Sequence, residues 1–234
     1  SLAQAYVEIG RYQEAINEFK EALRIDPRIR VHLDLARLYE KNENYIEAIK
    51  EYQEHLKRNT GKGLSLIYLE DLARLYNKIG NSQAVIATYQ KIITIEPEVS
   101  YYHYQLGEAY RKAGEYREAI NEFNEANRID PDSFSNKHGI AATYLSAKNY
   151  NEAVSRFKRL VIDFPFFADP YYNLGIAYDG AGQYAEAIEN FIKAEKLYAK
   201  SKNAAMAANS RKYARELSEL HGYKPEDFLY VVIP

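Results

Sequence analysis

Residues 106–131 read LGEAYRKAGEYREAINEFNEANRIDP, and this stretch contains the pattern that decides the fold. Leu106 and Tyr110 are spaced to share one face of a helix, and a second apolar set with helical spacing follows Gly114. Glycine is typical of a left-handed helix end. Pro131 disfavours helical geometry in the residue before it. The stretch therefore predicts two short helices that are joined by a tight turn and closed by a proline.

The same pattern occurs six times along the chain. Each copy has one alanine or glycine where its two helices should cross, at spacings of 33, 37, 34, 34 and 34 residues: Ala3, Ala36, Ala73, Gly107, Ala141 and Gly175. Small side chains at a crossing let two backbones approach closely, and an aromatic ring can fill the space beside them. Such a period predicts a solenoid in which each unit packs on its neighbours.

Each copy resembles the tetratricopeptide repeat, a helix-turn-helix unit of about 34 residues. The resemblance covers about residues 1–199. It implies an all-α fold, a right-handed superhelical solenoid of antiparallel helix pairs. The expected repeats span approximately residues 1–28, 29–65, 66–99, 100–133, 134–167 and 168–199. The first copy is truncated and begins inside its first helix, so we expect this chain to be part of a longer one.

Departures from the pattern predict local structure. Residues 59–63 replace the closing proline of the second copy, which predicts a longer, flexible loop. The sixth copy lacks a proline at Ala199, so its second helix should continue to about Lys200. Residues 200–222 should form a capping helix, because an open array needs a polar outer face over its last core. An apolar tail, residues 223–234, follows.

The tail contains the apolar, β-prone run FLYVVI at residues 228–233. Such a segment promotes association when it is exposed. Three placements are open: docking on the capping helix, the start of a following domain, or entry into the groove of a neighbouring molecule. We favour docking within the chain.

Composition narrows the classes of function. Thirty-one Lys and Arg against 33 Asp and Glu give a net charge of −2, which is a poor fit to nucleic-acid binding. The chain has no cysteine, so a thiolate metal site is excluded. That composition suits cytoplasm and periplasm, and we favour the cytoplasm. No apolar run approaches the roughly 20 residues that a membrane helix needs, so we expect no membrane insertion.

No catalytic motif is complete. Gly61-Lys62-Gly63 lacks the Ser or Thr that follows the lysine of a phosphate-binding loop. The five histidines never show the spacing of a zinc-binding helix, and neither a nucleophile elbow nor a dinucleotide-binding glycine fingerprint occurs. We therefore predict that this part of the chain is not an enzyme and has no cofactor, metal or catalytic residues.

The family resemblance implies that the first helices line a concave groove, and helical spacing identifies the stripe that faces it. The candidate groove residues are Arg30, Leu33, Arg37, Lys41, Glu70, Arg74, Lys78, Tyr101, Tyr104, Glu108, Arg111, Lys112, His138, Leu145, Tyr172 and Ile176. The lysines are equally well explained as soluble helix ends that are favourable near the helix dipole. A packed or solvated role is the more common one for a histidine such as His138.

The first three stripes carry six basic residues against two acidic ones, whereas apolar and aromatic residues appear from Tyr101 onwards. This pattern predicts a protein or peptide partner with acidic residues near one end and hydrophobic anchors at the other. The leading hypothesis is an adaptor or scaffold that holds one partner in the groove. The alternatives are a structural or self-assembly module, joined through the tail or the open first repeat, and the targeting arm of a larger protein.

Overall fold

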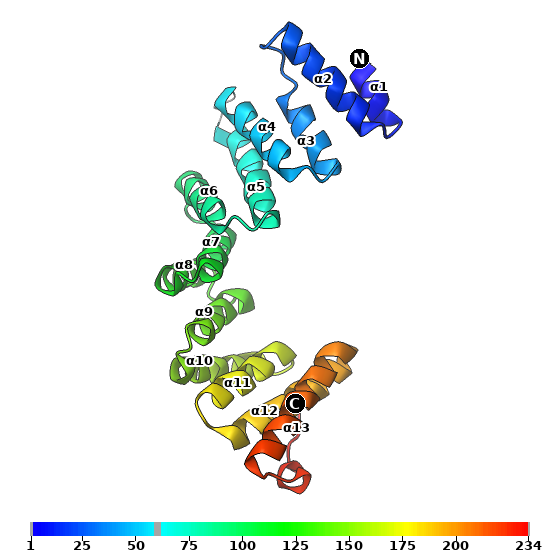
Figure 1. The fold of residues 1–234 in the computed structure, drawn as a ribbon. Helices are drawn as coiled ribbons and strands as arrows, with labels where there is room; N and C mark the ends of the chain where they lie inside the picture. Colours follow the sequence, from blue (N-terminus) through cyan, green and yellow to red (C-terminus); the bar gives the residue numbers. More distant parts are fainter. Residues whose placement is uncertain (1, 59–61, 234) are drawn as a thin grey trace. The chain divides into compact units, whose positions relative to one another are not determined.

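The computed structural model describes residues 2–58 and 62–233, and within these ranges the regular structure is entirely helical (Figure 1). The prediction of an all-α repeat fold is confirmed. The chain divides into two units, Ser1–Glu98 and Val99–Pro234, each with its own network of contacts. None of the described helices is both long and apolar enough to cross a membrane.

Unit 1 consists of helix pairs in which each helix packs on the next one along the chain. Its helices are α1 (Leu2–Glu8), α2 (Tyr12–Ile25), α3 (His32–Lys41), α4 (Tyr45–Arg58), α5 (Lys62–Lys78) and α6 (Ser82–Ile95). Ala15, Leu35, Ala36 and Ala48 are fully buried between these helices. The small residue expected at the crossing, Ala36, therefore lies in the core.

A loop is predicted over residues 59–63, and its predicted C-terminal end is wrong, because α5 already begins at Lys62. Lys62 and Gly63 lie in the first turn of this helix, where backbone N–H groups have no intrahelical partner and a glycine interrupts little. Residues 59–61 lie outside the described part of the chain.

Unit 2 continues the alternation of helices. Its elements are α7 (Ser100–Ala113), α8 (Tyr116–Ile129), α9 (Phe134–Ser146), α10 (Tyr150–Asp163), α11 (Ala168–Gly180), α12 (Tyr184–Lys200), α13 (Ala204–His221) and the short 3₁₀ helix η1 (Pro225–Phe228). The expected continuation of α12 to Lys200 is confirmed. The helix expected after it is α13, which ends at Gly222 in a left-handed conformation.

The core of unit 2 depends on glycine at two helix crossings. A Cβ atom at Gly139 would lie 2.6 Å from the ring of Phe123, and one at Gly107 would lie 2.9 Å from it. Phe123 itself is fully buried. The Phe123 ring of α8 thus fills the space that two glycines leave on α7 and α9. The pattern of small and aromatic residues predicts this for Gly107, whereas the predicted small residue of the fifth copy is Ala141 and not Gly139.

Tight turns join the two helices of each pair. Gly114 has the predicted left-handed conformation, with φ of 80°. In two other turns the same left-handed conformation is adopted by Glu43 (φ 58°) and Lys148 (φ 57°). The glycine pattern of the sequence does not predict this conformation at either residue. The N–H of Asn44 donates to the carbonyl of Tyr39 at 2.8 Å, so backbone hydrogen bonds hold the turn without glycine.

The apolar tail docks within the chain, as favoured above. Phe228 and Val231 are buried in one cluster with Ala214 and Leu217 of α13. The Lys196 ammonium of α12 donates a hydrogen bond of 2.5 Å to the carbonyl of Val231. The tail therefore covers the last part of the core, while neighbouring tail residues remain exposed: Leu229, Tyr230 and Val232.

Candidate functional site

Two adjoining hollows run along α3 in unit 1, and together we call them the α3 trough. The first, of ≈ 520 Å³, is lined from α1, α2 and α3 and includes Val7, Phe19 and Leu38. The second, of ≈ 430 Å³, is lined mainly from α3, α4 and α5. Arg37 and Lys41 line both hollows, so the two meet at these residues.

The trough brings together four of the predicted groove residues: Arg37, Lys41, Arg74 and Lys78. The one-turn spacing of Arg37 and Lys41 places both on the exposed face of α3. Three other predicted residues of this unit do not line it: Arg30, Leu33 and Glu70. Leu33 packs against the core, and Arg30 lines a separate hollow before α3.

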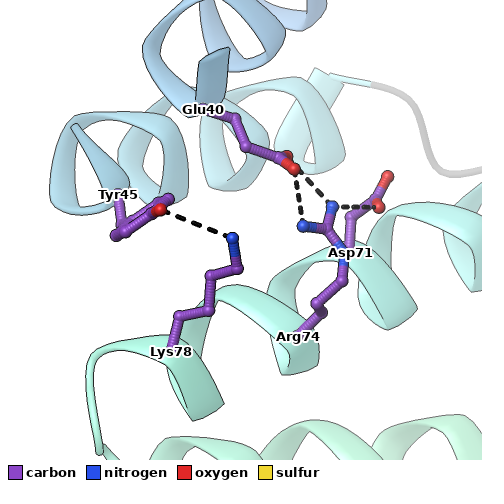
Figure 2. Close-up of polar contacts among 5 residues, drawn as sticks. All are labelled: Glu40, Tyr45, Asp71, Arg74 and Lys78. Atoms are coloured by element: carbon purple, nitrogen blue, oxygen red, sulfur yellow. Dashed lines mark hydrogen bonds and ion pairs between the residues drawn. The ribbon is translucent and has the colours of Figure 1, made fainter. Parts of the chain in front are cut away.

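Arg74 is held by two carboxylates of its own chain (Figure 2). Its guanidinium donates to both oxygens of Glu40 at 2.5 and 3.0 Å, and to Asp71 at 2.7 Å. The hydrogen bond with Glu40 raises the pKa of Arg74, and Asp71 adds to the effect. Because Glu40 lies on α3 and Arg74 on α5, the pair links successive helix pairs. Much of the charge of Arg74 is therefore compensated internally.

Two trough lysines lie over tyrosine rings of the preceding helix pair. The Lys78 ammonium is 4.7 Å from the centre of the Tyr45 ring and 3.4 Å from its hydroxyl (Figure 2). The Lys41 ammonium is 5.4 Å from the centre of the Tyr12 ring. Attraction between a cation and a ring face orients these side chains. The lysines are thus held in place by more than the helix dipole.

Arg37 differs from Arg74 in its surroundings. It is exposed, and it has no hydrogen-bond or ion-pair partner among the residues that the structure describes. Its position where the two hollows meet makes its guanidinium available to a carboxylate from outside the chain. Arg37 is accordingly the strongest candidate for a ligand-contacting cation in the trough.

Tyr52 of α4 also lines the trough, and its side chain is buried close to two carboxylates. Burial raises the pKa of Tyr52 to about 12, and the nearby charges of Asp71 and Glu40 add to the shift. The folded state therefore favours the neutral phenol over the phenolate.

This raised pKa predicts a loss of stability at alkaline pH. The contribution of Tyr52 is intact below pH 10.0, the ordinary value, and is lost as the pH rises towards about 12. Urea unfolding followed by circular dichroism should show a smaller alkaline loss for Tyr52→Phe than for the wild type. The exposed Tyr101→Phe should behave like the wild type. Equal alkaline losses in all three proteins would contradict the assignment.

In unit 2 several predicted groove residues contact other parts of the chain. Arg111 forms an ion pair of 2.7 Å with Glu108. The Tyr104 ring packs on Phe123 with centres 5.5 Å apart. Lys112 and Tyr101 are exposed, and Tyr101 also packs edge-on against its neighbouring tyrosine.

His138 is half-buried in unit 2. Its Nε2 lies 3.0 Å from the amide nitrogen of Asn173, and burial lowers its pKa, so the neutral ring accepts this hydrogen bond. The packed role is therefore the one that its surroundings support. Asn173 belongs to α11, so the contact joins α9 to the next helix pair.

The predicted residues nearest the C-terminus lie against α13 or the core. Tyr172 accepts a hydrogen bond of 2.9 Å from Asn209 of α13, and its ring packs edge-on against Phe191. Leu145 and Ile176 are half-buried against the core of this unit. These side chains are less available to a partner than the basic residues of the trough.

Sequence reasoning missed the histidine–glutamate pairs within two helix pairs. His32 lies 2.7 Å from Glu51, and His103 lies 2.7 Å from Glu122. In each pair the histidine and the glutamate are 19 residues apart in the sequence. This repeated spacing is the signal that could have identified the pairs. No group of three or more His, Cys, Asp or Glu in the described ranges is placed to hold a metal ion.

Comparison with known families and structures agrees with this architecture. Models described as tetratricopeptide repeat match residues 1–63 and 139–208, and residues 100–133. No curated protein sequence matches the chain.

The chain is also similar to solved structures at low sequence identity. MamA has 22% identity and a TM-score of 0.62, with 74% of this chain and 93% of MamA covered. A tetratricopeptide repeat protein from Parabacteroides merdae has 21% identity, a TM-score of 0.62 and coverage of 96% and 92%. YrrB, described as having an unusual peptide-binding site, has 17% identity, a TM-score of 0.58 and coverage of 83% and 97%.

Proposed function

Because this chain belongs to the tetratricopeptide-repeat family, we propose that it is a non-enzymatic scaffold that binds a segment of a partner protein in the α3 trough. Tetratricopeptide repeats generally mediate protein–protein interactions, and one structural neighbour is described as peptide-binding. The observation that carries the proposal is Arg37, an exposed cation at the meeting point of two hollows, which has no ion-pair or hydrogen-bond partner within residues 2–58 and 62–233.

The lining of the trough indicates the chemistry of the segment. Arg37 offers a planar, bidentate donor that suits a carboxylate. Val7, Phe19 and Leu38 line the hollow on the α1 side, where an apolar side chain can be buried. The other hollow is more polar and contains the Arg74 ion pairs. We therefore expect a segment with an acidic residue at Arg37 and an apolar residue on the α1 side.

Photocrosslinking tests this location. Peptides are first selected on the wild-type chain from a displayed random library, and photoreactive benzoylphenylalanine then replaces either Lys41 or Lys91. Lys41 lines both hollows, whereas Lys91 is an exposed residue of α6 outside them. The selected peptides should crosslink from position 41 and not from position 91. Crosslinking from position 91 alone would place binding elsewhere and overturn the proposal.

A further inference from the structure

A third hollow in unit 1, which we call the basic hollow, has no role in the α3 trough. Its volume is ≈ 490 Å³, and it is lined by Pro27, Arg28, Arg30, His32, His55 and Arg58. The first three residues connect α2 to α3, His32 begins α3, and the last two lie in the final turn of α4. Three arginines and two histidines thus line the hollow, and none of the described lining residues is a carboxylate.

His32, one of the residues that line the hollow, has a polar atom without a partner in the described structure. The residue is only 8% exposed, and its Nδ1 lies 2.7 Å from Glu51. Its Nε2 is buried and has no hydrogen-bond partner within the described structure. A buried polar atom without a partner lowers the stability of the folded state. With Nδ1–H donating to Glu51, Nε2 can accept a hydrogen bond from a hydroxyl of a ligand.

Contacts within the chain account for only part of the positive charge. Arg58 donates a hydrogen bond of 2.7 Å to the carbonyl of Pro27. Arg28 pairs with Asp26 at 3.3 Å, but its side chain is 93% exposed. Arg30 is exposed and has no ion-pair or hydrogen-bond partner among the described residues. The dipole of α4 favours a cation at Arg58, but it does not explain arginines in the connection before α3.

Two equivalent connections elsewhere in the chain carry the opposite charge, and the one after Pro165 begins with the uncharged Phe166. The residue after Pro97 is Glu98, and the residue after Pro131 is Asp132. The arginines after Pro27 are therefore not a general feature of the repeat. Like charges gathered in one hollow repel each other, and a bound anion would offset this repulsion.

We propose that the basic hollow binds a phosphate monoester. A phosphate carries nearly two negative charges and several acceptor oxygens, which match several guanidinium groups better than the single charge of a carboxylate does. The volume leaves space for the group that carries the phosphate. The phosphate can belong to a small molecule or to a phosphorylated side chain of a protein. Arg37 does not line this hollow, so the proposal does not depend on the function of the trough.

Calorimetric titration with two ligands, inorganic phosphate and a short phosphoserine peptide, tests the proposal. Both should bind the wild-type chain saturably in the millimolar range or tighter. Arg30→Glu should weaken binding by about tenfold or more, through loss of a charge-assisted contact and added repulsion. Lys91→Glu, the same charge change on an exposed residue of α6, should leave affinity within about twofold, because surface charges at a distance are screened.

The two ligands also identify the source of the phosphate. Tighter binding of the phosphopeptide indicates a phosphorylated protein, and equal affinities indicate a small phosphorylated molecule. NMR should show a shift of the His32 Nε2 signal on titration, while the His103 ring, in the equivalent pair with Glu122, should not shift. No saturable binding to the wild type, or equal weakening by Lys91→Glu, would overturn the proposal. Arg37→Gln, which introduces no negative charge near His55, should retain phosphate binding, which separates this test from that of the trough.

Discussion

Replacing Phe123 with alanine should lower the free energy of unfolding of unit 2 by about 3–5 kcal/mol, the usual loss for deleting a buried aromatic ring. Phe123 is fully buried and forms a core cluster with Ala119 and Ile140. Because Gly107 and Gly139 both lie against its ring, one substitution removes contacts from α7 and α9 together. The two glycines have no side chains that could fill the resulting cavity.

Native-state hydrogen exchange is the measurement that locates this effect. Protection should fall first in α7, α8 and α9, because repeats are stabilised mainly by their immediate neighbours. Helices α1 to α4 should keep their wild-type protection. Phe123→Leu, which retains most of the apolar volume, should show a smaller loss. An equal loss of protection along the whole chain would contradict the local coupling of the repeats.

Reversing the charge of Arg37 should have the largest effect on partner binding. Arg37→Glu should weaken the affinity for the selected peptides by about tenfold or more, since a hydrogen bond to a charged group contributes about 1.5–3 kcal/mol. The thermal midpoint should change little, because Arg37 has no ion-pair or hydrogen-bond partner among the described residues. Fluorescence anisotropy with the labelled peptides measures the affinity, and circular dichroism measures the midpoint.

Salt dependence and a matched variant make the test specific. Affinity for the wild type should fall as salt rises, and the dependence should be weaker for Arg37→Glu. Lys91→Glu should behave like the wild type. Arg74 is a poorer choice, because truncating it also removes the link between Glu40 and α5. Unchanged affinity of Arg37→Glu at low salt would mean that the peptides bind outside the trough.

Most of the fold could be predicted because its signals are local. A helix period, a small residue at the crossing and a glycine or proline at each end determine elements such as α7 and α8. Local signals fail where the backbone adopts a turn without its usual residue, as at Glu43 and Lys148. They also fail at Lys62, where the pattern of the second copy gives no closing proline and a helix begins earlier than expected.

The candidate site was harder to predict, because its charges are balanced between helices. Spacing within α3 correctly places Arg37 and Lys41 on one face, which is a property of one helix. The pairing of Glu40 with Arg74 depends on how successive helix pairs pack. These residues are 34 apart, whereas the second and third copies are offset by 37 residues, so comparing equivalent positions in adjacent repeats does not suggest the contact.

The docked tail also bears on how this protein would aggregate. Phe228 and Val231 are held in the core, and the Lys196 contact to the Val231 carbonyl fixes the segment in an irregular conformation. Detachment of this segment would expose the apolar, β-prone run at residues 228–233 while every long helix stays folded. Loss of soluble protein on storage would then follow the rate of this local opening and not the melting temperature.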